Sequence, residues 1–189
     1  MLGLILSDKE GAMRKQAMIF MWISFILFLS SCFNSSFKEG TEPDGFRNIK
    51  WGTNLESIEN MQHVENKRDF DEEIVIYTKK DDELIIGGAA LEKIEYSSWN
   101  NKFYKVGIYA NGHANCTALR ESAIEKFGKG KYKKKYIEWI GDKTIASFGT
   151  PLTDRCSLII LSYEIYEELI NQSGQKYQSK AKEGAEKGF

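Results

Sequence analysis

The chain has 189 residues, which is enough for one domain of ordinary size and excludes a large multidomain protein. Hydrophobic residues make up 42% and charged residues 28% of the sequence, as in a globular protein, and only two prolines argue against extensive disorder. The formal charge of −1 becomes −2 when the three basic and two acidic residues before Cys32 are removed, so the charge does not favour nucleic acid as a partner.

The N-terminal segment has the three-part plan of a secretory signal. Arg14 and Lys15 form a basic start, the 13 residues 17–29 are uncharged and mostly apolar, and small residues precede Cys32. A helix of this apolar run would span about 20 Å, short of the ~30 Å hydrocarbon core of a bilayer. The pattern therefore favours a cleaved signal, with an uncleaved signal anchor or a buried helix as the alternatives. Met13, directly before the basic pair, is the expected start of translation.

Leu29, Ser30, Ser31 and Cys32 resemble the lipobox of bacterial lipoproteins, which consists of an aliphatic residue, two small residues and a cysteine. The resemblance implies a diacylglycerol on the Cys32 sulfur, cleavage between Ser31 and Cys32, and acylation of the new amine by a fatty acid such as palmitate. Residues 1–31 are then the signal peptide, and lipid anchors the protein to a membrane of the cell envelope. In bacterial lipoproteins, an aspartate directly after the lipidated cysteine favours retention in the inner membrane. This chain has Phe33 there, which favours the outer membrane, with the protein facing the periplasm.

The segment 32–45 is rich in small, polar and turn-forming residues, and we expect it to be a flexible tether. A single α+β domain is predicted over 46–172. It begins with a short helix in which Thr53 and Glu56 form a capping box.

Apolar runs bounded by turn residues predict strands after this helix. In the last run, period-two alternation places Tyr104, Val106 and Ile108 on one face. A meander of antiparallel hairpins is expected over 70–78, 84–86, 91–96 and 103–109.

The clearest predicted helix runs from an Asn115 cap to Phe127, and Gly128 ends it. Its buried stripe comprises Cys116, Leu119, Ala123 and Phe127. Three more strands follow at 132–140, 143–148 and 156–163, then a short helix at 164–172. The charged segment 173–189 has almost nothing to bury and is predicted to be disordered.

These elements predict an α+β fold in which two helices pack on one face of an antiparallel sheet, in two helix-then-strands units. The plan is similar to that of the small outer-membrane assembly lipoproteins and the β-lactamase inhibitor proteins. This is an analogy of fold, and it implies no functional residue.

Cys116 and Cys156 are the cysteines that remain if Cys32 carries lipid. Export permits a disulfide between them, and closing a loop of about forty residues contributes ~4 kcal/mol in the chain-entropy model. The alternative is two separate buried thiols. A nucleophilic thiol is disfavoured because no family signature surrounds either cysteine.

Other polar clusters give no motif for catalysis, a metal or a cofactor. Neither His63 nor His113 has the spacing of metal ligands, and the acidic runs at 69–73 and 81–83 lack the pattern of a calcium loop. The Gly-Gly pair at 87–88 and the Gly-Lys-Gly-Lys run at 128–131 lack the glycine spacing of nucleotide-binding motifs.

The most concentrated basic feature is the lysine group Lys131, Lys133, Lys134 and Lys135. Lysines protect exposed strand edges from aggregation, and they also contact anionic lipid surfaces. Both interpretations stay open at this point.

The sequence thus favours a lipid-anchored, non-enzymatic envelope protein that binds another envelope protein or polymer, or supports an assembly. The alternative is an envelope enzyme or enzyme inhibitor whose site is assembled from residues distant in sequence. A deep polar pocket would favour the enzyme, and an exposed apolar patch would favour partner binding.

Overall fold

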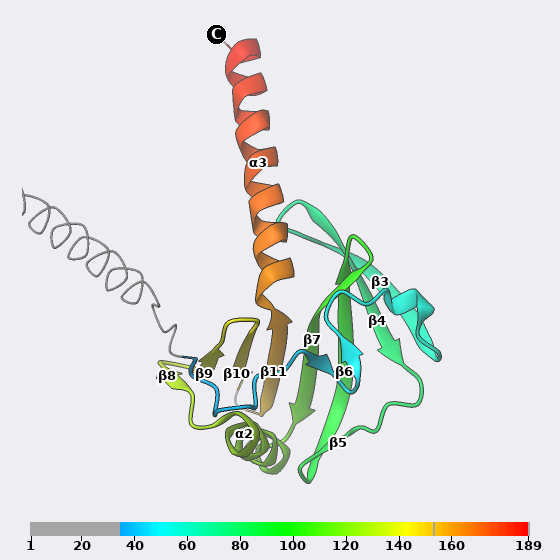
Figure 1. Cartoon of the computed structure of the whole chain (residues 1–189), viewed down its shortest axis with the longest axis vertical. Coiled ribbons are helices and arrows are strands. Elements are labelled where there is room, and N and C mark those ends of the chain that lie inside the picture. Colours follow the sequence, from blue (N-terminus) through cyan, green and yellow to red (C-terminus); the bar gives the residue numbers. More distant parts are fainter. Residues whose placement is uncertain (1–34, 153, 189) are drawn as a thin grey trace, which may run out of the picture. The chain divides into compact units, whose positions relative to one another are not determined.

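A computed structural model of the protein describes residues 35–152 and 154–188 (Figure 1). The signal peptide, Ser31 and Cys32 lie outside the described residues.

One antiparallel sheet forms the body of the fold, and all its neighbouring strands pair antiparallel. A short strand, β5 (Ile85–Ile86), pairs with the start of β6, and β1 (Gly45–Phe46) and β2 (Ile49–Lys50) form a separate two-stranded hairpin. The spatial order of the main strands is β3 (Met61–Asp69), β4 (Glu72–Lys79), β6 (Ala89–Trp99), β7 (Lys102–Asn111), β11 (Arg155–Ser162), β10 (Thr144–Leu152), β9 (Tyr136–Ile140) and β8 (Lys131–Lys133).

Two strand predictions need correction. The run 132–140 is a hairpin of β8 and β9 rather than one strand, with its turn at the paired lysines Lys134 and Lys135. Strand β3 was not predicted, because nearly all of its residues are exposed and polar. It is held by backbone pairing to β4 at the edge of the sheet, so no hydrophobic alternation marks it in the sequence.

The first predicted helix is only one 3₁₀ turn, η1 (Leu55–Ser57). Its cap is Asn54, whose side-chain oxygen accepts a hydrogen bond from Glu56 N at 3.1 Å, so the expected capping box of Thr53 is wrong. With Asn54 as the N-cap, Glu56 stands at the second helical position, whereas a capping box requires glutamate at the third.

Helix α2 (His113–Phe127) confirms the predicted helix, its buried stripe and its end at Gly128. It begins three residues earlier than the predicted Asn115 cap implies, because its N-cap is Gly112. Asn115 therefore lies inside the first turn, where its side chain bonds Asn111 O at 2.9 Å and Ala90 N at 3.1 Å.

Helix α3 (Tyr163–Gly188) is far longer than the predicted 164–172, and it includes most of the segment expected to be disordered. Side chains from α3 bind the β3–β4 turn: Ser173 is buried and donates to Phe70 O, and Lys180 pairs with Asp71 at 2.6 Å. These polar contacts fix residues that have little apolar surface to bury.

The core has two parts, one on each face of the sheet. On strand β4, Ile74 and Ile76 face α3, whereas Val75 and Tyr77 face the cluster that includes α2 and η1, as period-two alternation requires. The α+β class with an antiparallel sheet is confirmed, and η1 and α2 lie on one face of the sheet, although the first of the two predicted helices is a single 3₁₀ turn. The third helical segment, α3, covers the opposite face.

Tyr104 lies in the α3 core, so its predicted place beside Val106 and Ile108 is wrong. Ser97 pairs with Lys105 and Ser98 pairs with Phe103, which leaves Tyr104 as an extra residue in β7. This bulge turns its side chain to the other face.

The described part of the predicted tether, residues 35–45, packs against the domain. Phe37 is buried with its ring 5.4 Å from that of Phe127, and Ser36 N donates to Ile140 O at 2.8 Å. Glu42 accepts from Lys143 N and Thr144 N at 2.6 and 2.9 Å. One aromatic side chain and satisfied backbone groups therefore hold a segment whose composition predicted flexibility.

Candidate functional site

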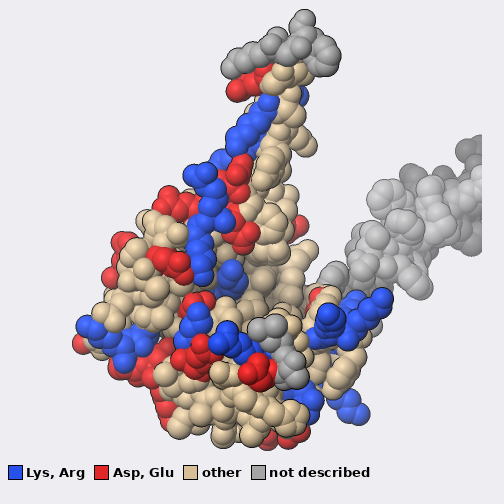
Figure 2. Space-filling model, turned by 180° about the vertical axis from the view of Figure 1, so that it is seen from behind, with Lys and Arg blue, Asp and Glu red and all other residues tan. Residues whose placement is uncertain are grey.

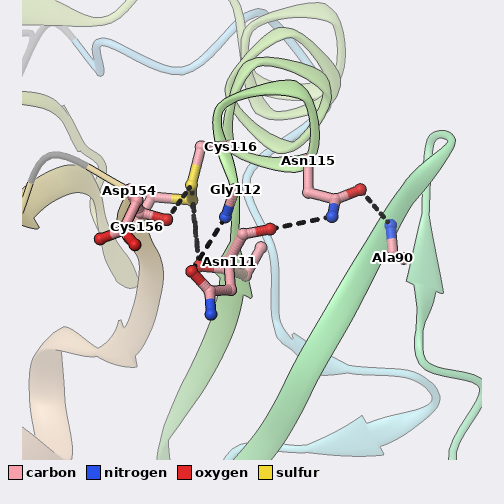
Figure 3. Close-up of a disulfide and its surroundings, with 8 residues drawn as sticks. Ala90, Asn111, Gly112, Asn115, Cys116, Asp154 and Cys156 are labelled. Carbon is pink, nitrogen blue, oxygen red and sulfur yellow. Dashed lines mark hydrogen bonds between the residues drawn. A yellow bond between two sulfur atoms is a disulfide. The ribbon is translucent and has the colours of Figure 1, made fainter.

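The predicted disulfide between Cys116 and Cys156 is present, with the two Cα atoms 5.6 Å apart (Figure 3). It joins the first turn of α2 to the start of β11 across 40 positions of sequence. Gly112 N donates to Asp154 O at 2.7 Å beside it. Because both sulfurs are in the bond, this pair offers no nucleophilic thiol.

The predicted lysines Lys131, Lys133, Lys134 and Lys135 are all exposed on the β8–β9 hairpin. Strand β8 is the last strand of the sheet, which gives the edge-protection interpretation a structural basis. Lys133 Nζ lies 3.9 Å from a Glu138 carboxylate oxygen. In Figure 2, basic side chains lie on the side of the molecule where β8 lies, as well as along α3 and at the opposite edge. Contact with an anionic surface stays a prediction.

The two histidines lie apart and are exposed. His63 Nε2 lies 2.6 Å from Asn66 Oδ1, and His113 begins α2. Within residues 35–152 and 154–188, no group of three His, Cys, Asp or Glu side chains is arranged to hold a metal ion.

Glu72 differs from the other residues of the acidic run 69–73 because its side chain is buried. It accepts from Trp99 Nε1 and Gln172 Nε2, both at 3.3 Å, and pairs with Lys176 Nζ at 2.5 Å. The hydrogen bond from Lys176, with help from Trp99, lowers the pKa of Glu72 against the opposing effect of burial. This carboxylate is therefore a charged anchor for α3 and is poorly suited to donate a proton.

The face of the sheet opposite α2 is uncovered over β7, β11, β10 and β9, beyond the first turns of α3. Register places its side chains in three rows across the strands, and we call this surface the open face. Its middle is partly buried and apolar or small, and Lys105 and Glu138 are the charged residues at its two ends. The rows are Tyr109, Ser157, Gly149 and Tyr136; Gly107, Ile159, Ser147 and Glu138; and Lys105, Leu161, Ile145 and Ile140.

A shallow groove of about 410 Å³ lies in the open face around Gly149. Tyr136 and Ser157 flank the glycine on the neighbouring strands, and Ser147 lies next to it on the same face. A Cβ at Gly149 would meet only ordinary van der Waals contacts, the nearest at 3.6 Å, so the missing side chain is what leaves the groove open.

The β6–β7 end of the open face carries charged and aromatic groups. Lys93 pairs with Glu95 at 2.6 Å and lies 4.9 Å from the centre of the Tyr109 ring. Burial, with Glu95 nearby, raises the pKa of Tyr109 to about 12. Burial lowers the pKa of Lys105. The open face thus combines an apolar groove with a polar rim, as protein-binding surfaces do.

Two other hollows lie elsewhere on the domain. A cleft of about 350 Å³ at the start of α3 is rimmed by the exposed carboxylates Asp142, Glu164 and Glu168, the last paired with Lys102 at 2.7 Å. An apolar cavity of about 250 Å³ lies between α2 and residues 43–47. Neither hollow was predicted, because residues far apart in the sequence line each of them.

None of the helices in the described residues is both long enough and apolar enough to cross a membrane. Comparison with protein-family models, curated proteins and solved structures finds no match for this chain.

Proposed function

We propose that this protein is a lipid-anchored, non-enzymatic protein of the bacterial cell envelope whose open face binds another envelope component. The lipobox-like leader supports the location, because it places an acylated Cys32 at the start of the mature chain. The disulfide between Cys116 and Cys156 supports export, since such bonds persist outside the reducing cytoplasm.

The open face is the observation that carries the binding role. Ile145, Ile159 and Leu161 are partly exposed to water and lie close together on the two neighbouring strands β10 and β11, where Ile145 pairs with Leu161. Contiguous exposed apolar surface with a polar rim is typical of a partner-binding site. Tyr136, 43% exposed, adds a rigid aromatic group of the kind that dominates binding energy.

The location is tested by the mass of the N-terminal peptide of the natively expressed protein. We expect an acylated peptide that begins at Cys32, and a Cys32→Ser variant that is unacylated and leaves the membrane fraction or keeps its leader. An unmodified, uncleaved N-terminus in the wild-type protein contradicts the proposed anchor.

The binding role is tested by a photoreactive residue at Ser147 on the open face, with Glu121 on the exposed side of α2 as the matched control. We expect one defined envelope adduct at Ser147, its loss when Gly149→Trp fills the groove, and no such adduct at Glu121. Equal adducts at both positions, or an adduct that Gly149→Trp leaves unchanged, contradict the assignment.

The second candidate is an envelope enzyme or enzyme inhibitor, and the charged cleft at the start of α3 is the observation that favours it. Asp142 and Glu168 would be its acidic groups. Asp142→Asn with Glu168→Gln would then abolish function in cells while leaving the Ser147 adduct intact. Loss of function from Gly149→Trp alone supports the binding role.

A further inference from the structure

Lysines surround the point at which the described chain enters the domain. Ser36 bonds Ile140 of β9, the strand that pairs with β8, and Lys38 N donates to Phe127 O at 2.6 Å. A Cβ at Gly128 would lie 3.3 Å from Lys38 Cβ, so Lys38 stands beside the start of the lysine-rich segment. We call the following six side chains the anchor-side lysines: Lys38, Lys129, Lys131, Lys133, Lys134 and Lys135.

All six anchor-side lysines are exposed, and their charge is only partly compensated. Glu39, Glu125 and Glu138 flank them in the sequence. Among the residues that the structure describes, only Lys133 of the six has a carboxylate within ion-pair distance, Glu138 at 3.9 Å. A pair at this distance between partly exposed groups is weak. The surface therefore keeps a net positive field.

The covalent chain keeps this field close to the predicted lipid. Cys32 is four residues before Ser36, so an extended backbone reaches at most about 14 Å. The docked segment 36–38 takes up none of that reach, because it is bound to β9 and to the end of α2. A lysine within about a Debye length of an anionic bilayer, ~8 Å at physiological salt, is attracted to it.

We propose that the anchor-side lysines form a second membrane contact, which binds the anionic phospholipid headgroups of the bilayer that holds the lipid on Cys32. The proposal rests on the proposed function in one respect, because the lipid is what brings the lysines to the membrane. It orients the domain: β8 lies next to the bilayer, and β3, seven strand spacings away, lies roughly 34 Å further out. The groove in the open face, which Lys135 and Tyr136 help to line, then lies near the membrane surface, where a membrane-bound envelope partner can reach it.

Edge protection alone predicts a different behaviour for the same lysines. It predicts that lysine-to-glutamine substitutions on β8 promote self-association of the domain through this edge, and it predicts no change in binding to anionic vesicles. Lysine-to-glutamine substitutions therefore separate the two roles.

The test uses residues 35–189, which contain both core clusters and every strand pair of the described structure, so lipid on Cys32 has no part in it. We would measure cosedimentation with vesicles of phosphatidylcholine that contain phosphatidylglycerol, and with vesicles of phosphatidylcholine alone. We expect binding only to the anionic vesicles at about 0.1 M salt, and its loss at about 0.5 M salt.

The decisive variant replaces Lys133, Lys134 and Lys135 by glutamine. Each lysine near an anionic surface contributes about five-fold to partitioning, so the variant should bind on the order of 100-fold more weakly. The control replaces three exposed lysines elsewhere by glutamine, and it has the same net charge as the decisive variant. These lysines are Lys67, Lys80 and Lys182. We expect it to bind within about three-fold of wild type.

The proposal is overturned if the wild-type domain does not bind anionic vesicles, if both triple variants weaken equally, or if binding ignores salt. Unchanged thermal unfolding of each variant shows that the fold is retained. The mass of the Cys32 peptide reports separately on the lipid anchor, so failure of one proposal is distinguishable from failure of the other.

Discussion

The ion pair between Glu72 and Lys176 links the β3–β4 hairpin to the middle of α3, and its two partners are unequally buried. The Glu72 side chain is 5% exposed, whereas that of Lys176 is 44% exposed. Lys176→Met therefore leaves a carboxylate in the core with only Trp99 and Gln172 as partners. Glu72→Gln leaves an ammonium that water can solvate.

The unequal burial predicts unequal costs. Removing the partner of a buried charge costs about 3 kcal/mol, so we expect Lys176→Met to lower the free energy of unfolding by about that amount. Glu72→Gln keeps acceptor and donor groups at the site and should cost about 1 kcal/mol. The double variant should cost less than the sum, because neither charge is then left alone.

The pH dependence follows from the lowered pKa of Glu72. Its stabilisation is complete above the unfolded-state pKa of about 4.5 and is lost as pH falls through the lower folded-state value. In Lys176→Met the main cause of that lowered pKa is gone and burial, which raises the pKa, remains, so the acid destabilisation contributed by Glu72 should shrink or reverse, a shift in the pH dependence of stability that narrows the gap to wild type as pH falls. Urea unfolding between pH 3 and 7 measures this shift.

Hydrogen exchange locates the effect. We expect Lys176→Met to increase amide exchange in residues 173–185 before it affects α2, because α3 loses an attachment to β4. The reasoning is refuted if Lys176→Met and Glu72→Gln cost equal amounts, or if Lys176→Met costs less than about 0.5 kcal/mol.

Three further outcomes are expected. Replacing Cys116 and Cys156 by alanine should lower the free energy of unfolding by about 4 kcal/mol, measured in urea, and wild type treated with a reductant should match the variant. Phe37→Ala should cost about 3 kcal/mol in the same assay, and no effect would show that residues 35–45 do not contribute to the fold. Gly174→Ala should raise the helical content and stability by up to about 1 kcal/mol, since the glycine is exposed within α3 with open space at its Cβ, and a loss would contradict a helix there.

Local pattern was sufficient where a segment buries one apolar face. The alternating residues of β6, β7 and β11 predicted strands, and the stripe of α2 with its Gly128 end predicted that helix. The pairing of Cys116 with Cys156 followed from reserving Cys32 for lipid. For the strands and for α2, the signal lies in neighbouring residues of the chain.

The candidate binding surface could be predicted only in part. Alternation along β11 predicts that Ser157, Ile159 and Leu161 share a face, but the sequence does not say which face a helix covers. The groove exists because register places Gly149 between Tyr136 and Ser157 on different strands. The predicted lysines were found from their density alone, and only the fold places Lys38 beside them.

By itself, the sequence determined the α+β class, most strands and helix α2, because local spacing and composition encode them, and it predicted the disulfide from the small number of cysteines. Tertiary structure alone decided the extent of α3, the existence of β3, the docking of residues 35–45 and the position of Tyr104. Two of these depend on partners distant in sequence: Glu72 and Phe70 hold α3, and Phe127 and Ile140 hold the docked segment. The other two depend on strand pairing: β4 holds β3, and the bulge opposite Ser97 and Ser98 places Tyr104. Polar anchoring, edge pairing and bulges produce no hydrophobic periodicity in the sequence, so these interactions can be identified only in the folded structure.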